Sequence, residues 1–180
     1  MPPFVDSLYL HLNKTNVRLP GENMINARYH YLFRLTLAEC MENKRRYIPA
    51  IEKALVALCN QNSWSIPAHD RNLNNYHGTD YYVDLVVATA GNGIAQCVAM
   101  LDDRLSPEVK ARVQCAFRKK YFVLYTVAWK RQSLSGGLRL QITGTRFVWQ
   151  VSRVLPSLCW RIRRNALILL PQPRNIMYTV

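Results

Sequence analysis

The feature that most constrains the fold of this chain is the absence of carboxylates after Glu108. All 11 Asp and Glu residues lie within residues 1–108, together with 10 of the 24 Lys and Arg residues. The other 14 basic residues lie in residues 109–180, so the formal net charge of +13 comes entirely from this second segment. In a chain of average composition, an acid-free stretch of this length has a probability of roughly 1 in 10,000. The two segments therefore need separate interpretations.

The first segment has the hydrophobic periodicity of helices. Apolar or aromatic residues recur at helical spacing from Asn26 to Asn43. A second stripe begins after Pro49, a residue tolerated in a first helical turn, and extends to Asn60. The stretch from Asp80 to Leu101 is apolar on nearly all sides, which indicates a largely buried helix. Ser106 as N-cap, followed by Pro107, predicts the start of a further helix.

These helices are separated by a long loop and followed by a segment of different character. Residues 61–79 are polar, contain Pro67 and Gly78, and have no sustained period. The sequence therefore predicts an all-α fold of antiparallel helical hairpins over residues 1–120. Residues 121–180 are rich in β-branched and aromatic residues that conflict with an all-helical partner, and we expect an irregular tail without a defined domain.

Cysteine usage and hydropathy indicate the class of environment. The five cysteines are widely spaced and show no metal-ligand spacing, so we expect no metal and no cofactor. Four of them lie in apolar helical surroundings, so we expect these to be buried thiols. The amino terminus lacks the pattern of a signal peptide, and no apolar run is long enough to span a membrane. This interpretation favours the cytoplasm over secretion.

Three stretches of the first segment carry a resemblance to a known family. They are "LAECMENK" in the first predicted helix, "WSIPAHD" in the loop, and "VDL" at the start of the apolar helix. In this order they resemble the amino-terminal region of heparinase II/III-like proteins, and the resemblance covers about residues 2–118. It implies an (α/α) toroid, of which this chain would contain an incomplete part, and a polysaccharide-lyase activity on acidic polysaccharide.

The resemblance also implies a chemistry, β-elimination on a uronic acid. One group neutralises the uronate carboxylate, a base removes the C5 proton, and an acid protonates the leaving oxygen. The family typically uses Asn or Arg for the first task and Tyr and His for the others. Most of these residues lie beyond the matched region, so we expect this chain by itself to be inactive.

The loop at residues 61–79 is where the resemblance places substrate contacts. Trp64 would stack on a sugar, His69 would donate a hydrogen bond or transfer a proton, and Arg71 would pair with a carboxylate. His69 and Tyr76 are the candidates for catalysis. The predicted substrate-binding residues are Trp64, His69, Asp70, Arg71, Asn75, Tyr76 and His77.

Structural interpretations of the same residues stay open. Trp64 equally fits a core position at a helix end. The adjacent His69 and Asp70 equally fit a pair that holds the loop, because an Asp fixes an imidazole tautomer without catalysis. The other charged loop residues fit a solvated surface, and Asp84 fits either a charge in a first helical turn or a site residue.

The tail lacks the Asn-Asn-Trp motif with which the family continues, and a displaced reading frame accounts for this. Residues 141–154 can be written in permitted codons whose bases, read from the last base of the Gln141 codon, encode "NNWNSVCLAGVTG". The third codon bases are a choice, whereas the first and second are dictated by the protein sequence. Carried through the tail, this frame restores acidic residues and helical periodicity. We therefore predict a one-base displacement between about Arg118 and Phe122.

Two other functions are compatible with the sequence. A nucleic-acid- or polyanion-binding protein would use the basic tail, because phosphate binding requires little more than such charge. The abundance of Val, Leu, Ile and Trp in the tail argues against it, and no nucleic-acid partner is expected. A sugar-binding, non-catalytic α-toroid protein would differ from a lyase only in residues that this chain does not contain.

Overall fold

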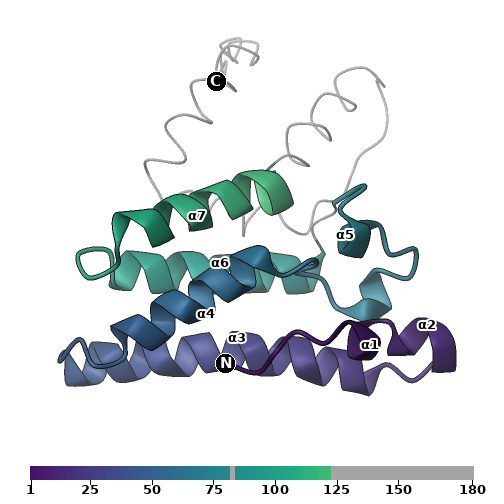
Figure 1. Ribbon diagram of the computed structural model, residues 1–180, viewed down its shortest axis with the longest axis horizontal. Helices are drawn as coiled ribbons and strands as arrows, with labels where there is room; N and C mark the ends of the chain where they lie inside the picture. Colours follow the sequence, from purple (N-terminus) through teal and green to yellow (C-terminus); the bar gives the residue numbers. More distant parts are fainter. Residues whose placement is uncertain (82–83, 123–180) are drawn as a thin grey trace, which may run out of the picture.

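The computed structural model describes residues 1–81 and 84–122, and this part of the chain contains helices and no strand (Figure 1). The predicted all-α class is confirmed. The elements are α1 (Asp6–Tyr9), α2 (His11–Thr15), α3 (Leu19–Glu42), α4 (Ile48–Asn60), the 3-10 turn η1 (Pro67–His69), α5 (Asn74–His77), α6 (Leu85–Met100), α7 (Pro107–Phe117) and the π-helical turn η2 (Arg118–Phe122). The predictions for residues 123–180 lie outside the described residues.

Consecutive long helices run antiparallel to each other. Figure 1 shows α3 and α4 running in opposite directions, and α6 and α7 doing the same above them. The helices pack through α3 on α4, α4 on α7 and α3 on α6. The shared core includes Leu32, Leu55, Ile94 and Phe117, each at most 1% exposed. Burial of such a side chain contributes about 1.5–3 kcal/mol, which explains why the apolar stripes predicted these helices.

The start of α3 differs from the prediction, whereas its end agrees. α3 begins at Leu19, well before the predicted Asn26, with a proline in its first turn. A Cβ on Gly21 would lie 2.8 Å from the carbonyl oxygen of Leu8, so the absence of a side chain lets the amino-terminal segment approach the helix closely. Periodicity analysis missed this turn because Pro20 and Gly21 usually mark a break, and its apolar residue, Leu19, is exposed. The helix ends at Asn43, whose φ of 54° is a left-handed cap.

The second hairpin also corrects two expectations. Within the apolar stretch Asp80–Leu101, α6 begins at Leu85 and is capped by Asp84, which accepts a 2.7 Å hydrogen bond from the backbone N–H of Val87. Ser106 occupies the N-cap position of α7 as predicted, yet its hydroxyl makes no capping hydrogen bond. Its backbone N–H instead donates to Glu52 Oε1 at 2.6 Å, which ties the start of α7 to α4.

Candidate functional site

The loop between α4 and α6 is organised around a buried carboxylate, Asp70. Its side chain is fully buried and accepts hydrogen bonds from the Tyr9 hydroxyl at 2.8 Å and from the backbone N–H groups of Asn75 and Tyr76 at 3.0 and 2.8 Å. Asn75 is only 3% exposed. Both residues, predicted to contact substrate, lie beneath the surface in this structure, where Asp70 fixes the start of α5.

Trp64 is a core residue and not a platform for a sugar. Its side chain is 2% exposed, and its indole N–H donates to the carbonyl oxygen of Leu58 at 2.9 Å. The Phe117 ring meets it edge-on, with centroids 5.2 Å apart. The structure therefore places Trp64 in the core position of the alternative interpretation, with its indole enclosed.

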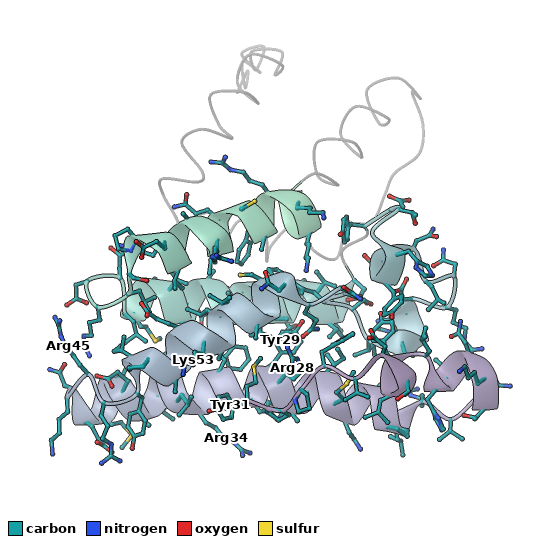
Figure 2. All side chains as sticks on the ribbon, in the orientation of Figure 1. Arg28, Tyr29, Tyr31, Arg34, Arg45 and Lys53 are labelled. Carbon is teal, nitrogen blue, oxygen red and sulfur yellow. The ribbon has the colours of Figure 1, made fainter. Side chains whose placement is uncertain are left out.

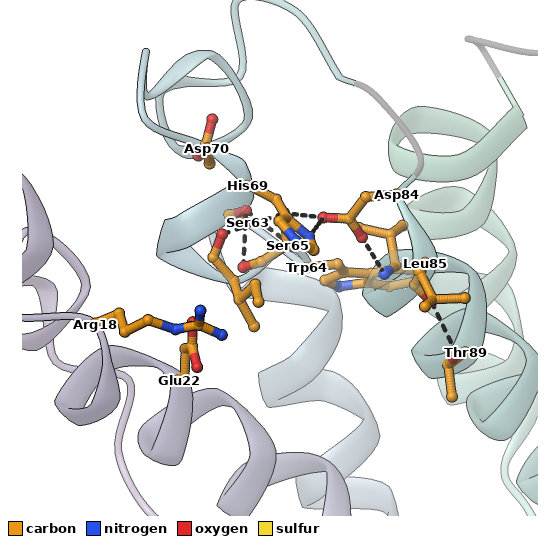
Figure 3. A network of polar contacts seen from close by, with 12 residues as sticks. Arg18, Glu22, Ser63, Trp64, Ser65, His69, Asp70, Asp84, Leu85 and Thr89 are labelled. Atoms are coloured by element: carbon orange, nitrogen blue, oxygen red, sulfur yellow. Dashed lines mark hydrogen bonds and ion pairs between the residues drawn. The ribbon is translucent and has the colours of Figure 1, made fainter.

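His69 is oriented by Asp84 and not by its neighbour in sequence. Its Nδ1 lies 2.8 Å from Asp84 Oδ2, and the Ser65 hydroxyl donates to the same carboxylate (Figure 3). Asp84 also caps α6, which is the structural use considered for it from the sequence. The His69 side chain is 44% exposed, and its other ring nitrogen has no partner among the described residues. This geometry holds an imidazole in one orientation at the surface.

Arg71 lies on the outer side of the loop, against α2. Its guanidinium donates to Asn16 Oδ1 at 3.3 Å, and its backbone carbonyl accepts from Asn13 Nδ2 at 2.9 Å. A pocket described below is lined in part by Tyr76 and His77, and neither Arg71 nor His69 is among its lining residues. The structure therefore separates the predicted site residues into buried supports, outer surface groups and two that line a pocket.

That pocket is strongly basic. It has a volume of about 660 Å³ and lies between the end of α4, α5 and the junction of α7 with η2. No Asp or Glu occurs among the lining residues that the structure describes. The lining comprises Cys59, Asn60, Gln61, Asn62, Tyr76, His77, Gly78, Tyr81, Arg112, Cys115, Ala116, Lys119 and Lys120. We call it the basic pocket.

Two of its cations are available to a ligand and one is committed to the fold. Arg112 and Lys119 are exposed, and no carboxylate of the described chain pairs with them. Lys120 is 7% exposed, and its ammonium donates to the carbonyl oxygens of Cys59, at 2.9 Å, and Gln61. Burial lowers the pKa of Lys120 to about 8. Lys120 thus closes the carboxyl-terminal end of α4, where a cation is favoured.

Tyr76 faces this pocket with one side already packed. Its ring stacks on Tyr9, with centroids 5.1 Å apart, and its hydroxyl donates to Asp6 Oδ1 at 2.7 Å. The hydrogen bond to Asp6, and secondarily burial, raises the pKa of Tyr76. The phenol is therefore held protonated beside the pocket, where it supplies a polar edge.

The basic residues of this pocket were missed by the sequence analysis. Arg112 and Lys119 are seven positions apart, which is about two helical turns and places both on one helix face. That spacing could have identified the pair from the sequence. It was missed because all the basic residues after Glu108 were interpreted together as one basic segment. The loop prediction found Tyr76 and His77 and not the helix opposite them.

Comparisons with known proteins assign no family to this chain. A scan against models of known protein families finds no match, and a search of curated proteins finds none. Within residues 1–81 and 84–122, no group of three or more His, Cys, Asp or Glu side chains is placed to hold a metal ion. In the same part of the chain, no helix is both long and apolar enough to cross a membrane.

Proposed function

We propose that this chain is the amino-terminal part of a heparinase II/III-like polysaccharide lyase and that its basic pocket binds an acidic saccharide. The observation that carries the proposal is the pocket lining itself, in which Arg112 and Lys119 face the predicted loop residues Tyr76 and His77 without a carboxylate among the described residues. The three loop and helix stretches that resemble the family support the same assignment.

The composition of the pocket suits a charged sugar. Arg112 and Lys119 supply charge for a carboxylate or sulfate, since an ionised hydrogen bond is about twice as strong as a neutral one. Asn60 and Asn62 are exposed and offer amides that can donate to and accept from sugar hydroxyls. A neutral saccharide would leave the cations without partners, so the pocket favours the acidic class.

The proposed role of this chain is binding and not the complete elimination. Arg112 or Lys119 could neutralise a uronate carboxylate, which is the first task of the chemistry. His69, oriented by Asp84, lies outside the pocket lining and is not placed to exchange a proton with a sugar bound there. We therefore expect the chain to bind uronate oligosaccharides without cleaving them.

Binding by the full chain tests the proposal. Calorimetry with oligogalacturonates should show binding that weakens as salt is raised, and the uncharged cello-oligosaccharide of equal length should not bind. Arg112→Gln and Lys119→Gln should each weaken binding about tenfold, a loss of about 1.4 kcal/mol. Lys14→Gln, which removes an exposed charge on α2 outside the pocket, should bind like the original chain. Equal affinity for the charged and neutral sugars would refute the assignment.

A second experiment separates a lyase from a non-catalytic sugar-binding protein. The gene with its predicted frame restored should yield a product that generates the ultraviolet absorbance of an unsaturated uronate. Binding without that absorbance would identify the non-catalytic alternative. A salt-sensitive shift of duplex DNA, without binding to oligogalacturonates, would instead support the nucleic-acid-binding alternative.

A further inference from the structure

A second pocket adjoins the basic pocket on the other side of residues 60–62. It has a volume of about 950 Å³ and lies between the amino-terminal segment, α3 and α4. Asn60, Gln61 and Asn62 line both pockets, so the two meet at the end of α4. We call this second hollow the N-terminal pocket. A ligand that leaves the basic pocket across Asn60 and Asn62 would enter it.

The N-terminal pocket also presents unpaired positive charge. Lys53 is exposed, and no carboxylate of the described residues pairs with it. Arg46 is 63% exposed and makes a 3.4 Å ion pair with Glu42, which leaves much of its guanidinium open to solvent. Figure 2 shows Lys53 on α4 near Arg28 and Tyr31 on α3, all beside the amino-terminal segment.

Arg28 has a different, structural role in this pocket. It is 3% exposed, and its guanidinium donates to Gln61 Oε1 at 2.8 Å, to the carbonyl oxygen of Ala57 at 3.3 Å and to that of Pro2. These bonds fix the amino-terminal segment against the end of α4. Buried hydrogen bonds therefore fix the residues between the two pockets, and their position does not require a bound ligand.

One carboxylate, that of Asp6, lies at the junction of the two pockets, and it already accepts a hydrogen bond. Asp6 is the single acidic residue among the described residues that line either pocket. Its Oδ1 accepts the hydroxyl of Tyr76 at 2.7 Å. The exposed amides of Asn60 and Asn62 stand beside it. The junction is thus polar and only weakly repulsive to an anion, between two regions of positive charge.

The spacing of the charges sets the length of a suitable ligand. Lys53 and Asn60 are two turns apart on α4, which corresponds to about 10 Å along the helix axis. Arg112 and Lys119 lie beyond Asn60 on the far side of the junction. A single anionic sugar cannot contact both ends at once. A chain with repeated negative groups can.

We propose that the two pockets form one continuous track for an acidic oligosaccharide of several units, which extends from Arg112 and Lys119 across Asn60 and Asn62 to Lys53. This inference rests on the proposed function, because it names the length and charge pattern of the ligand that enters the basic pocket. A single-stranded nucleic acid fits the track less well, since it needs open aromatic faces for its bases. The Tyr76 ring has one face covered by Tyr9.

A length series tests the track directly on the full chain. Oligogalacturonates from dimer to octamer should bind with rising affinity, and the octamer should bind at least about tenfold more tightly than the dimer because its far end gains contacts at no second association cost. Lys53→Gln should abolish most of that gain and leave dimer binding unchanged. Arg112→Gln should weaken dimer and octamer alike. Asp6→Asn, which keeps an acceptor for Tyr76, should tighten octamer binding by about threefold.

The outcomes distinguish the two proposals. If the dimer binds and added length brings no affinity, or if Lys53→Gln binds the octamer like the original chain, the track is wrong and the basic pocket stands. If no oligogalacturonate binds, the proposed function fails together with the track. Tighter binding of a single-stranded DNA of equal charge than of the octamer would also overturn the track as an oligosaccharide site. Lys14→Gln serves as the matched charge control throughout.

Discussion

Replacement of Asp70 by alanine is the sharpest test of how the loop supports the pocket. Asp70 is fully buried and accepts three hydrogen bonds, from the Tyr9 hydroxyl and from the backbone N–H groups of Asn75 and Tyr76. The variant Asp70→Ala removes every acceptor at once. The two backbone donors at the start of α5 then lose the acceptor that Asp70 supplies, and α5 carries Tyr76 into the basic pocket.

The expected cost follows from counting the donors that lose their partner. The Tyr9 hydroxyl keeps an alternative, because Ser63 Oγ lies 2.8 Å from it. The N–H groups of Asn75 and Tyr76 lose the acceptor that Asp70 supplies, and a buried hydrogen bond broken on one side costs about 1–3 kcal/mol. Partial entry of water reduces the sum. We therefore expect Asp70→Ala to lower the free energy of unfolding by about 3 kcal/mol and to weaken oligogalacturonate binding.

Urea unfolding followed by far-ultraviolet circular dichroism measures this cost. Asp80→Ala is the matched control, because it removes an exposed carboxylate from the same loop. The control should unfold within about 0.5 kcal/mol of the original chain, as surface substitutions usually do. If Asp70→Ala and Asp80→Ala shift the unfolding midpoint equally, the buried network does not hold the loop and our account of the site is refuted.

Three further outcomes are expected. Asp84→Ala removes the cap of α6 and should lower the free energy of unfolding by about 1 kcal/mol, measured by thermal melting; an unchanged melting temperature would contradict the cap. Gly93→Ala would place a Cβ 2.4 Å from Phe33 Cζ and should cost about 1–3 kcal/mol, with part of the loss recovered by adding Phe33→Leu; a neutral single variant would disprove that close contact. Burial raises the pKa of Cys59 to about 11, so at pH 8 its thiolate should be about 100-fold scarcer than that of an ordinary thiol, and iodoacetamide should label exposed Cys115 first; equal labelling rates by peptide mass spectrometry would contradict this.

The helices were predictable because their signals are local. The apolar stripe of α4 recurs every third or fourth residue, and the residues that make it are buried as the pattern requires. The boundaries were less predictable where a boundary depends on a distant partner. Gly21, in the first turn of α3, lies against Leu8 and Pro67, and no periodicity within α3 predicts that close approach. The start of α7 likewise depends on a distant residue, because Glu52 accepts from the Ser106 N–H while the expected hydroxyl cap is not formed.

The site was predictable only as a region. Residue types identified the loop, but burial decides whether each residue supports the structure or meets a ligand. Asp70 is buried because Tyr9, 61 positions earlier, reaches over it, and a contact at that separation leaves no local pattern. Tyr76 and His77 look no different in sequence from Asn75, yet they line the pocket while Asn75 lies beneath it. Tertiary packing made that distinction.

Lys120 bears on the predicted displacement of the reading frame. A buried ammonium is costly unless its donors find partners, and Lys120 donates to two carbonyl oxygens at the end of α4 while its ammonium lies 5.8 Å from the centroid of the Trp64 ring. A residue supplied by a wrong frame would meet this combination only by chance. The coding register should therefore hold through Lys120, which narrows the predicted interval to the codons that follow it, up to Phe122. Sequencing the gene should locate the extra or missing base there; a break before Lys120, or an intact register into the tail, would contradict the argument.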